Sequence, residues 1–243
     1  MMLLGQKIGR SDFIPPIVRK LLKREKGYDA YRPFVHEILS SYGQYHEDLV
    51  LDILFSCKNE GFYIDVGAND PEELSNTKRF YEKGWSGINI EPTPHLYEKL
   101  CVSRKRDINL NVGIAPERGE MPFYIMSADT LSSFDKEAAL KSGKIHGAKL
   151  LDDISIQVLP LNEIFDLHVR GRCVDILSVD VEGFDLDVLK SNDWERNRPY
   201  ALIVEINQDE SNILQYLEGQ DYLLVYNNFT NGVFIDNRAG FQS

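Results

Sequence analysis

The stretch GFYIDVGANDPEE, residues 61–73, decides the fold. Its run FYIDV has the length and the apolar character of a strand that is buried on both faces, and Gly67 follows at once. A strand that runs into a glycine turn is typical of the opening unit of nucleotide-binding α/β folds. This loop has one turn glycine where such loops usually have two or three, so its glycine pattern does not identify the ligand. The charge of the loop indicates the ligand instead.

The loop is crowded with acids: Asp65, Asp70, Glu72 and Glu73. They would surround a bound pyrophosphate with like charge, whereas a carboxylate can hydrogen-bond an ammonium group. S-adenosylmethionine carries an α-ammonium and a sulfonium, so the loop predicts this cofactor, with Asp65 and Gly67 beside it. Asn69 stands where a second glycine is usual, because asparagine tolerates the left-handed conformation. The alternative is an ordinary strand-to-helix turn.

Apolar runs of strand length alternate with segments of helical period along the rest of the chain, as in IDV, INI, ILSV and LIVEI. At the end, YLLVYNN and GVFIDN are separated by only residues 229–231, which leaves room for a hairpin and none for a helix. The pattern predicts an α/β fold with a doubly wound, Rossmann-like sheet, mostly parallel and closed by a C-terminal antiparallel hairpin. That is the layout of class I methyltransferases, whereas a dinucleotide dehydrogenase more often continues with a further βα unit.

Two segments stand apart from this alternation. We expect residues 1–40 to form a basic N-terminal arm and residues 41–243 to form the α/β domain, with an insertion at about 115–160. The insertion is too long for a plain crossover, and we expect it to fold over the carboxyl edge of the sheet, where open α/β sheets bind ligands.

Composition limits the possible partners and compartments. The 243 residues carry a net charge of −11, which argues against nucleic acid, because binding phosphates needs a basic face. Residues 1–32 carry eight basic and three acidic side chains, a net +5, so the arm could touch an anionic membrane surface; the alternative is a solvated arm that docks on the domain or a neighbour. Three widely spaced cysteines show no disulfide framework, which favours a reducing cytoplasm.

Glu91 ends the second strand-like run, 26 residues after Asp65. An acid at this place is typical of the group that binds ribose hydroxyls, and Pro92 begins the turn that follows. Gln44 precedes an amphipathic helix and could reach the cofactor from that turn; the alternative is a plain helix-cap region. These residues complete the predicted cofactor site.

Carboxylates also follow the next two strand-like runs. SVDVEGFD places Asp180 and Glu182 at the end of one strand, and ALIVEIN places Glu205 and Asn207 at the end of its neighbour. Three acids and an amide at one edge could orient a hydroxyl and take its proton, or hold a divalent metal through Asp180, Glu205 and Asn207. A structural hydrogen-bonding role is the third possibility.

The motifs together resemble the FkbM family of S-adenosylmethionine-dependent methyltransferases over about residues 41–206. The resemblance is carried by SYGQYHEDLVLDILF, FYIDVGAND, the downstream IEP, TLSSF at residues 130–134, and VDILSVDVEGF followed by LIVEI. It implies transfer of a methyl group, usually to a hydroxyl of a sugar, glycan or related natural product. It also implies that Asp65, Gly67 and Asn69 belong to the cofactor loop, that Glu91 binds the ribose, and that Asp180 lies beside the methionine end or the acceptor.

The resemblance also implies that Ser132 and Ser133 lie in a stretch that faces the acceptor, but it does not fix the base. From the residues themselves, we expect Asn207 to contact the acceptor and Asp180 to act as the base, with Glu182 or Glu205 in support. Two other functions remain open at this point. One is a nicotinamide-dependent oxidoreductase on the same architecture, and the other is a non-catalytic glycan-binding relative.

Overall fold

The computed structural model describes residues 41–206 and 209–239. The predicted basic arm and Asn207 lie outside the described residues. In the described part, no helix is long and apolar enough to cross a membrane.

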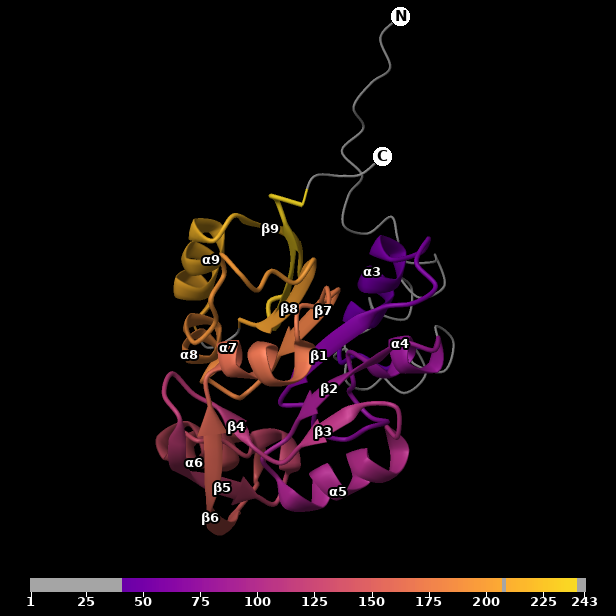
Figure 1. The fold of residues 1–243 in the computed structure, drawn as a ribbon. Coiled ribbons are helices and arrows are strands. Elements are labelled where there is room, and N and C mark those ends of the chain that lie inside the picture. Colours follow the sequence, from indigo (N-terminus) through magenta and orange to yellow (C-terminus); the bar gives the residue numbers. More distant parts are fainter. Residues whose placement is uncertain (1–40, 207–208, 240–243) are drawn as a thin grey trace, which may run out of the picture. The chain divides into compact units, whose positions relative to one another are not determined.

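A seven-stranded sheet forms the centre of the domain, with the order β3-β2-β1-β7-β8-β10-β9 (Figure 1). The first five of these strands in spatial order are parallel, and β10 runs antiparallel to both β8 and β9. The prediction of a mostly parallel α/β sheet with a C-terminal antiparallel hairpin is confirmed. The strands are β1 (Phe62–Val66), β2 (Ser86–Ile90), β3 (Ile108–Leu110), β7 (Ile176–Val179), β8 (Ala201–Glu205), β9 (Tyr222–Asn227) and β10 (Asn231–Asp236).

Short helices connect these strands. The loop after β1, residues 67–77, is called here the glycine loop, and the helix that follows it begins at Lys78. The helices are α3 (Glu47–Leu54), α4 (Lys78–Glu82), α5 (Pro94–Ser103), α7 (Leu161–Ile164), the π-helix η3 (Phe165–Val169), α8 (Asp185–Lys190) and α9 (Glu210–Gly219).

The segment expected as an insertion forms a second, three-stranded sheet with the order β4-β6-β5. Its long antiparallel pair joins β5 to β6, and its helix begins after Asp135, whose side chain caps the first turn. The elements are β4 (Gly113–Ile114), β5 (Gly119–Met126), the 3₁₀-helix η2 (Asp129–Leu131), α6 (Lys136–His146) and β6 (Leu150–Leu159).

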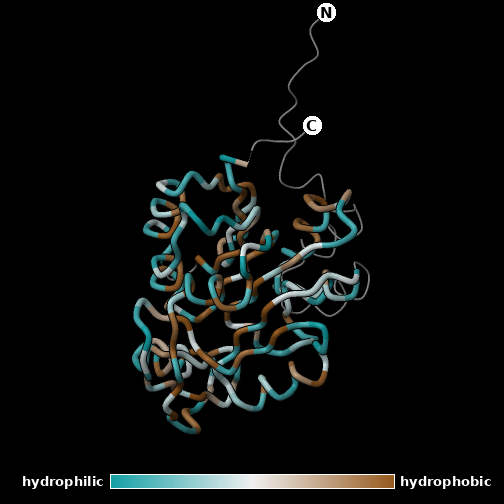
Figure 2. Tube along the Cα trace, viewed as in Figure 1, coloured by the Kyte–Doolittle hydropathy of each residue, from teal (hydrophilic) through white to brown (hydrophobic). Residues whose placement is uncertain are grey.

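The core lies on both faces of the large sheet. All five residues of β1 and all five of β8 are buried, which is why their sequences are apolar nearly throughout. Figure 2 shows hydrophobic residues along the central strands and hydrophilic residues in many of the outer loops. A rigid sheet of this kind fixes the positions at which its strands end.

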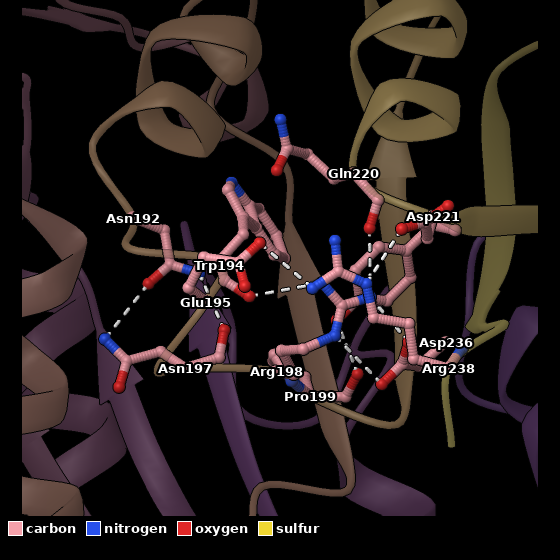
Figure 3. A network of polar contacts seen from close by, with 11 residues as sticks. Asn192, Trp194, Glu195, Asn197, Arg198, Pro199, Gln220, Asp221, Asp236 and Arg238 are labelled. Carbon is pink, nitrogen blue, oxygen red and sulfur yellow. Dashed lines mark hydrogen bonds and ion pairs between the residues drawn. The ribbon is translucent and has the colours of Figure 1, made fainter. Parts of the chain in front are cut away.

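Arg198 fastens the C-terminal hairpin to the rest of the sheet (Figure 3). Its guanidinium makes a bidentate contact with Asp236, in which Nε lies 3.1 Å from Oδ2 and Nη2 lies 2.5 Å from Oδ1. It also donates hydrogen bonds to the carbonyls of Trp194 and Gln220. The ring of Tyr222 lies 4.8 Å from the guanidinium carbon. Bidentate arginine pairs are stronger than ordinary hydrogen bonds, so this contact stabilises β10 beside β8.

Candidate active site

The candidate site lies where β1, β2, β7 and β8 end, on either side of the point at which the strand order reverses. Backbone hydrogen bonds join these ends. Gly67 N donates to Ile90 O at 2.9 Å, and Asp180 N donates to Val66 O at 3.1 Å. The loop after β1 is thereby held between the ends of its two neighbouring strands, at the edge where open α/β sheets bind ligands.

Gly67 is required by both conformation and space. Its φ is +79°, and a Cβ at this position would lie 1.9 Å from the carbonyl oxygen of Asp180. Only glycine can bring the two loops this close. Asn69 has φ +49°, so it takes the left-handed conformation that its place in the loop predicts.

Glu91 holds the far side of the glycine loop. The residue is 3% exposed, and its carboxylate accepts from Asn69 N at 2.8 Å and from Thr93 N at 2.7 Å. Burial raises the pKa of Glu91, and the hydrogen bonds from Thr93 and Asn69 oppose that rise. A carboxylate has about four acceptor sites, so Glu91 can still accept from ligand hydroxyls. Pro92 follows in a buried turn.

The side chain of Asp65 is buried, and neighbouring hydroxyl groups bind it. It is 4% exposed, its Oδ2 accepts from the Thr77 hydroxyl at 2.7 Å, and Ser178 also hydrogen-bonds its side chain. Burial raises the pKa of Asp65, and these hydroxyls lower it. Asp65 therefore fastens the end of the loop, and its contact with a cofactor stays a prediction. Gln44 lies half-buried in the turn before α3, and its role also stays a prediction.

The structure brings three predicted carboxylates together: Asp180, Glu182 and Glu205, called here the edge carboxylates. One oxygen from each lies within 4.8 Å of the others. The strand β7 ends at Val179, so Asp180 and Glu182 do not share a strand face as their spacing suggests. A turn brings them together instead, because Glu182 has φ +54° and Gly183 has φ +96°.

Close packing of these acids changes their protonation. The pKa of Asp180 is raised well above its ordinary value, first by burial and then by the charges of Glu182 and Asp185. Burial, with repulsion from Asp185, raises the pKa of Glu182 to about 7. Buried like charges favour shared protons or a bound cation, and a carboxyl that titrates near neutral pH suits proton transfer.

Asp185 shapes this turn, although the sequence pattern does not single it out. Its Oδ1 accepts from Val181 N and its Oδ2 from Gly183 N, both at 3.1 Å. Burial raises the pKa of Asp185 to about 7. An aspartate directly after a Gly-Phe pair and before a helix is a signal for such side-chain capping of the backbone.

Of the two predicted acceptor-side serines, Ser133 joins the insertion to the same turn, and Ser132 makes a contact within the insertion. Ser133 donates to Glu182 O at 3.1 Å and accepts from Asp135 N at 3.0 Å. Ser132 accepts from Met126 N at 3.0 Å. Both side chains are engaged in holding the TLSSF stretch in place, so their contact with an acceptor stays a prediction.

Glu47 is a further buried acid beside the site that the sequence pattern does not reveal. Its Oε1 accepts from the side-chain amides of Asn228 and Asn231, both at 2.7 Å, and its Oε2 accepts from Tyr45 N at 2.9 Å. Its charge also raises the pKa of Asp180. Glu47 thus joins α3 to the hairpin, through partners more than 180 positions away.

The donor set fits the cofactor that the sequence predicts. Glu91 offers carboxylate oxygens beside the glycine loop, and the edge carboxylates supply negative charge for a cationic group. The same three carboxylates have the oxygen chemistry that magnesium and calcium prefer. Asn207, the remaining predicted ligand, lies outside the described residues.

Comparison with known proteins gives one match. Residues 65–224, more than half of the chain, match the sequence model described as the Methyltransferase FkbM domain. No curated protein and no solved structure matches the chain. The match begins at Asp65 and spans the glycine loop, the insertion, and the strands β7 and β8, whose ends carry the edge carboxylates. It favours methyl transfer over the nicotinamide-dependent alternative.

Proposed function

The chain belongs to the FkbM methyltransferase family, and from that premise we propose that it transfers a methyl group from S-adenosylmethionine to a hydroxyl of a sugar, glycan or related natural product. The observation that carries the proposal is the meeting of the glycine loop, Glu91 and the edge carboxylates at one edge of the sheet. When bound, the cofactor supplies an electrophilic methyl group on a sulfonium.

Cofactor binding is assigned to the β1 and β2 ends. Glu91 binds the ribose hydroxyls, and the loop that contains Gly67 and Asn69 lies against the methionine portion. Net negative charge at this edge favours the ammonium and sulfonium groups over a pyrophosphate, which supports this cofactor rather than a dinucleotide.

Proton transfer is assigned to the edge carboxylates. A sugar hydroxyl is a weak nucleophile, so a group must take its proton and hold its oxygen in line with the methyl group. Asp180 takes the proton, with Glu182 or Glu205 in support. The pKa of Glu182, raised to about 7, supports proton transfer by this cluster, because a base is most effective when it titrates close to the working pH. Asp180 takes the proton in its ionised form, which the positive charge of the bound cofactor favours.

A divalent cation is the alternative way to activate the hydroxyl. Asp180 and Glu205, with Asn207, would hold the metal, which would lower the pKa of a bound hydroxyl and relieve the repulsion among the carboxylates. A chelator separates this possibility from direct proton transfer to Asp180.

The proposal is tested by labelled-methyl transfer to extracts of glycan precursors, with and without a chelator. The expected result is label in an alkali-stable ether of a carbohydrate product. Loss of activity in the chelator, restored by magnesium or manganese, would assign the metal role. A chain that binds the cofactor and labels no carbohydrate or related hydroxyl product would contradict the proposed O-methylation.

A further inference from the structure

Arg104 is a buried cation directly behind the glycine loop. It is 1% exposed, stands at the C-terminal cap of α5, and is among the largest fully buried side chains of the described residues. Burial raises the pKa values of Asp65 and Tyr63, and the positive charge of Arg104 opposes that rise, so Arg104 acts electrostatically on two residues of β1. A buried arginine costs free energy unless its hydrogen bonds are made, so its partners indicate what it holds.

Two of those partners lie in the glycine loop, and the third lies in β1. Nη2 donates to Pro71 O at 2.8 Å and to Ser75 Oγ at 2.9 Å, and Nη1 donates to Tyr63 Oη at 3.3 Å. Tyr63 in turn donates to Asp107 at 2.5 Å. One planar guanidinium thus spans the loop from residue 71 to residue 75 and fixes both positions to β1.

The segment around α5 holds the loop at three successive residues. Glu91, just before the helix, binds Asn69 N; Lys99 pairs with Asp70 at 3.0 Å; and Arg104 binds Pro71 O. The Lys99 pair is solvated and contributes little. Glu91 and Arg104 are buried, so these two contacts set the conformation of the loop.

We propose that Arg104 is a positioning residue for the cofactor, whose guanidinium holds residues 71–75 of the glycine loop in the conformation that accepts S-adenosylmethionine. The inference rests on the proposed function. It requires an arginine, because a lysine ammonium is a point charge and cannot place planar donors on Pro71 O, Ser75 Oγ and Tyr63 Oη together.

Arg104→Lys tests this, with two matched controls. Arg106 is a neighbouring arginine whose guanidinium carbon lies 3.8 Å from the centre of the Tyr81 ring. Its donors reach the carbonyls of Tyr81 and Trp85 instead of the glycine loop. Arg106→Lys therefore changes the same chemistry without touching the loop. Arg198→Lys lowers stability far from the site, which shows what destabilisation alone does to binding.

The readouts are S-adenosylhomocysteine affinity by calorimetry and amide exchange of residues 68–77. We expect Arg104→Lys to weaken affinity about tenfold and to speed exchange in this loop, while both controls bind as the wild type does. Ser75→Ala, which removes a single acceptor, should weaken affinity two- to threefold and serves if Arg104→Lys does not fold.

Wild-type affinity in a folded Arg104→Lys protein, or in Ser75→Ala if that variant alone folds, would overturn the inference and leave the proposed function intact. Equal weakening in Arg104→Lys and in Arg198→Lys would also overturn it, because the loss would then follow from stability. A wild-type chain that binds no S-adenosylhomocysteine would overturn the proposed function together with the inference.

Discussion

Replacing Asp180 by asparagine should stabilise the protein at neutral pH while it removes activity. Asp180 has a strongly raised pKa in the folded protein, so it keeps a proton there that the unfolded chain releases above a pH of about 4. Between those two pKa values the folded state binds more protons than the unfolded state, and stability falls as pH rises. Asparagine has no such proton to retain, so the variant escapes this loss.

The magnitude follows from proton linkage. One group that is protonated when folded and ionised when unfolded lowers the free energy of unfolding by about 1.4 kcal/mol per pH unit, over the pH range between its unfolded and its folded pKa. For a chain of this size, 1 kcal/mol shifts the melting temperature by about 2–4 °C. The melting temperature of Asp180→Asn should therefore gain on that of the wild type by roughly 3–6 °C for each pH unit in this range.

Thermal unfolding of the ligand-free proteins at a series of pH values measures this difference. Asp153→Asn, a change at an exposed residue of β6, is the matched control and should track the wild type. Methyl transfer by Asp180→Asn should fall at least 100-fold while S-adenosylhomocysteine affinity stays near that of the wild type. A melting-temperature difference that does not change with pH would refute the reasoning about the carboxylate cluster, and near-normal turnover would refute the role of Asp180.

Three further outcomes follow from the same contacts. Gly67→Ala should lose roughly 2–4 kcal/mol of stability and most cofactor affinity, because its methyl group would meet the carbonyl of Asp180 and its φ is positive; melting and calorimetry check both, and wild-type values would contradict the packing. Arg198→Lys should lower the free energy of unfolding by about 2 kcal/mol, because it loses the bidentate contact with Asp236, and it should leave cofactor affinity unchanged. Chemical denaturation and calorimetry measure the two effects, and an unchanged denaturation midpoint would contradict the role of this contact. Millimolar magnesium or calcium should raise the melting temperature more at pH 8 than at pH 5.5, because a cation offsets the charge of the edge carboxylates only when they ionise; an equal response at both pH values would argue against a cation there.

Much of the fold could be predicted from the sequence because it depends on short-range patterns. Apolar runs such as FYIDV and LIVEI are long enough for strands and too short for helices, and the three residues of the final turn leave room only for a hairpin. The ends of these runs also gave the edge carboxylates, because parallel strands bring their carboxyl ends to one edge of a sheet.

The rest depended on contacts that no local pattern reveals. Arg104 reaches partners 29 to 41 positions away, and nothing in its neighbourhood marks it as buried. Glu182 adopts a positive φ that glutamate rarely takes, so the turn that brings it to Asp180 was not predictable from residue type. The sequence shows the charge of Asp65 but not the hydroxyl of Thr77 that binds it.

Titration of the purified chain with S-adenosylhomocysteine and, separately, with NAD tests the central claim most directly. The account predicts one-to-one binding of S-adenosylhomocysteine, strongly weakened by Gly67→Ala and by Glu91→Gln, and no binding of NAD. Binding of NAD instead, or an S-adenosylhomocysteine affinity that neither substitution changes, would contradict a cofactor site at the ends of β1 and β2.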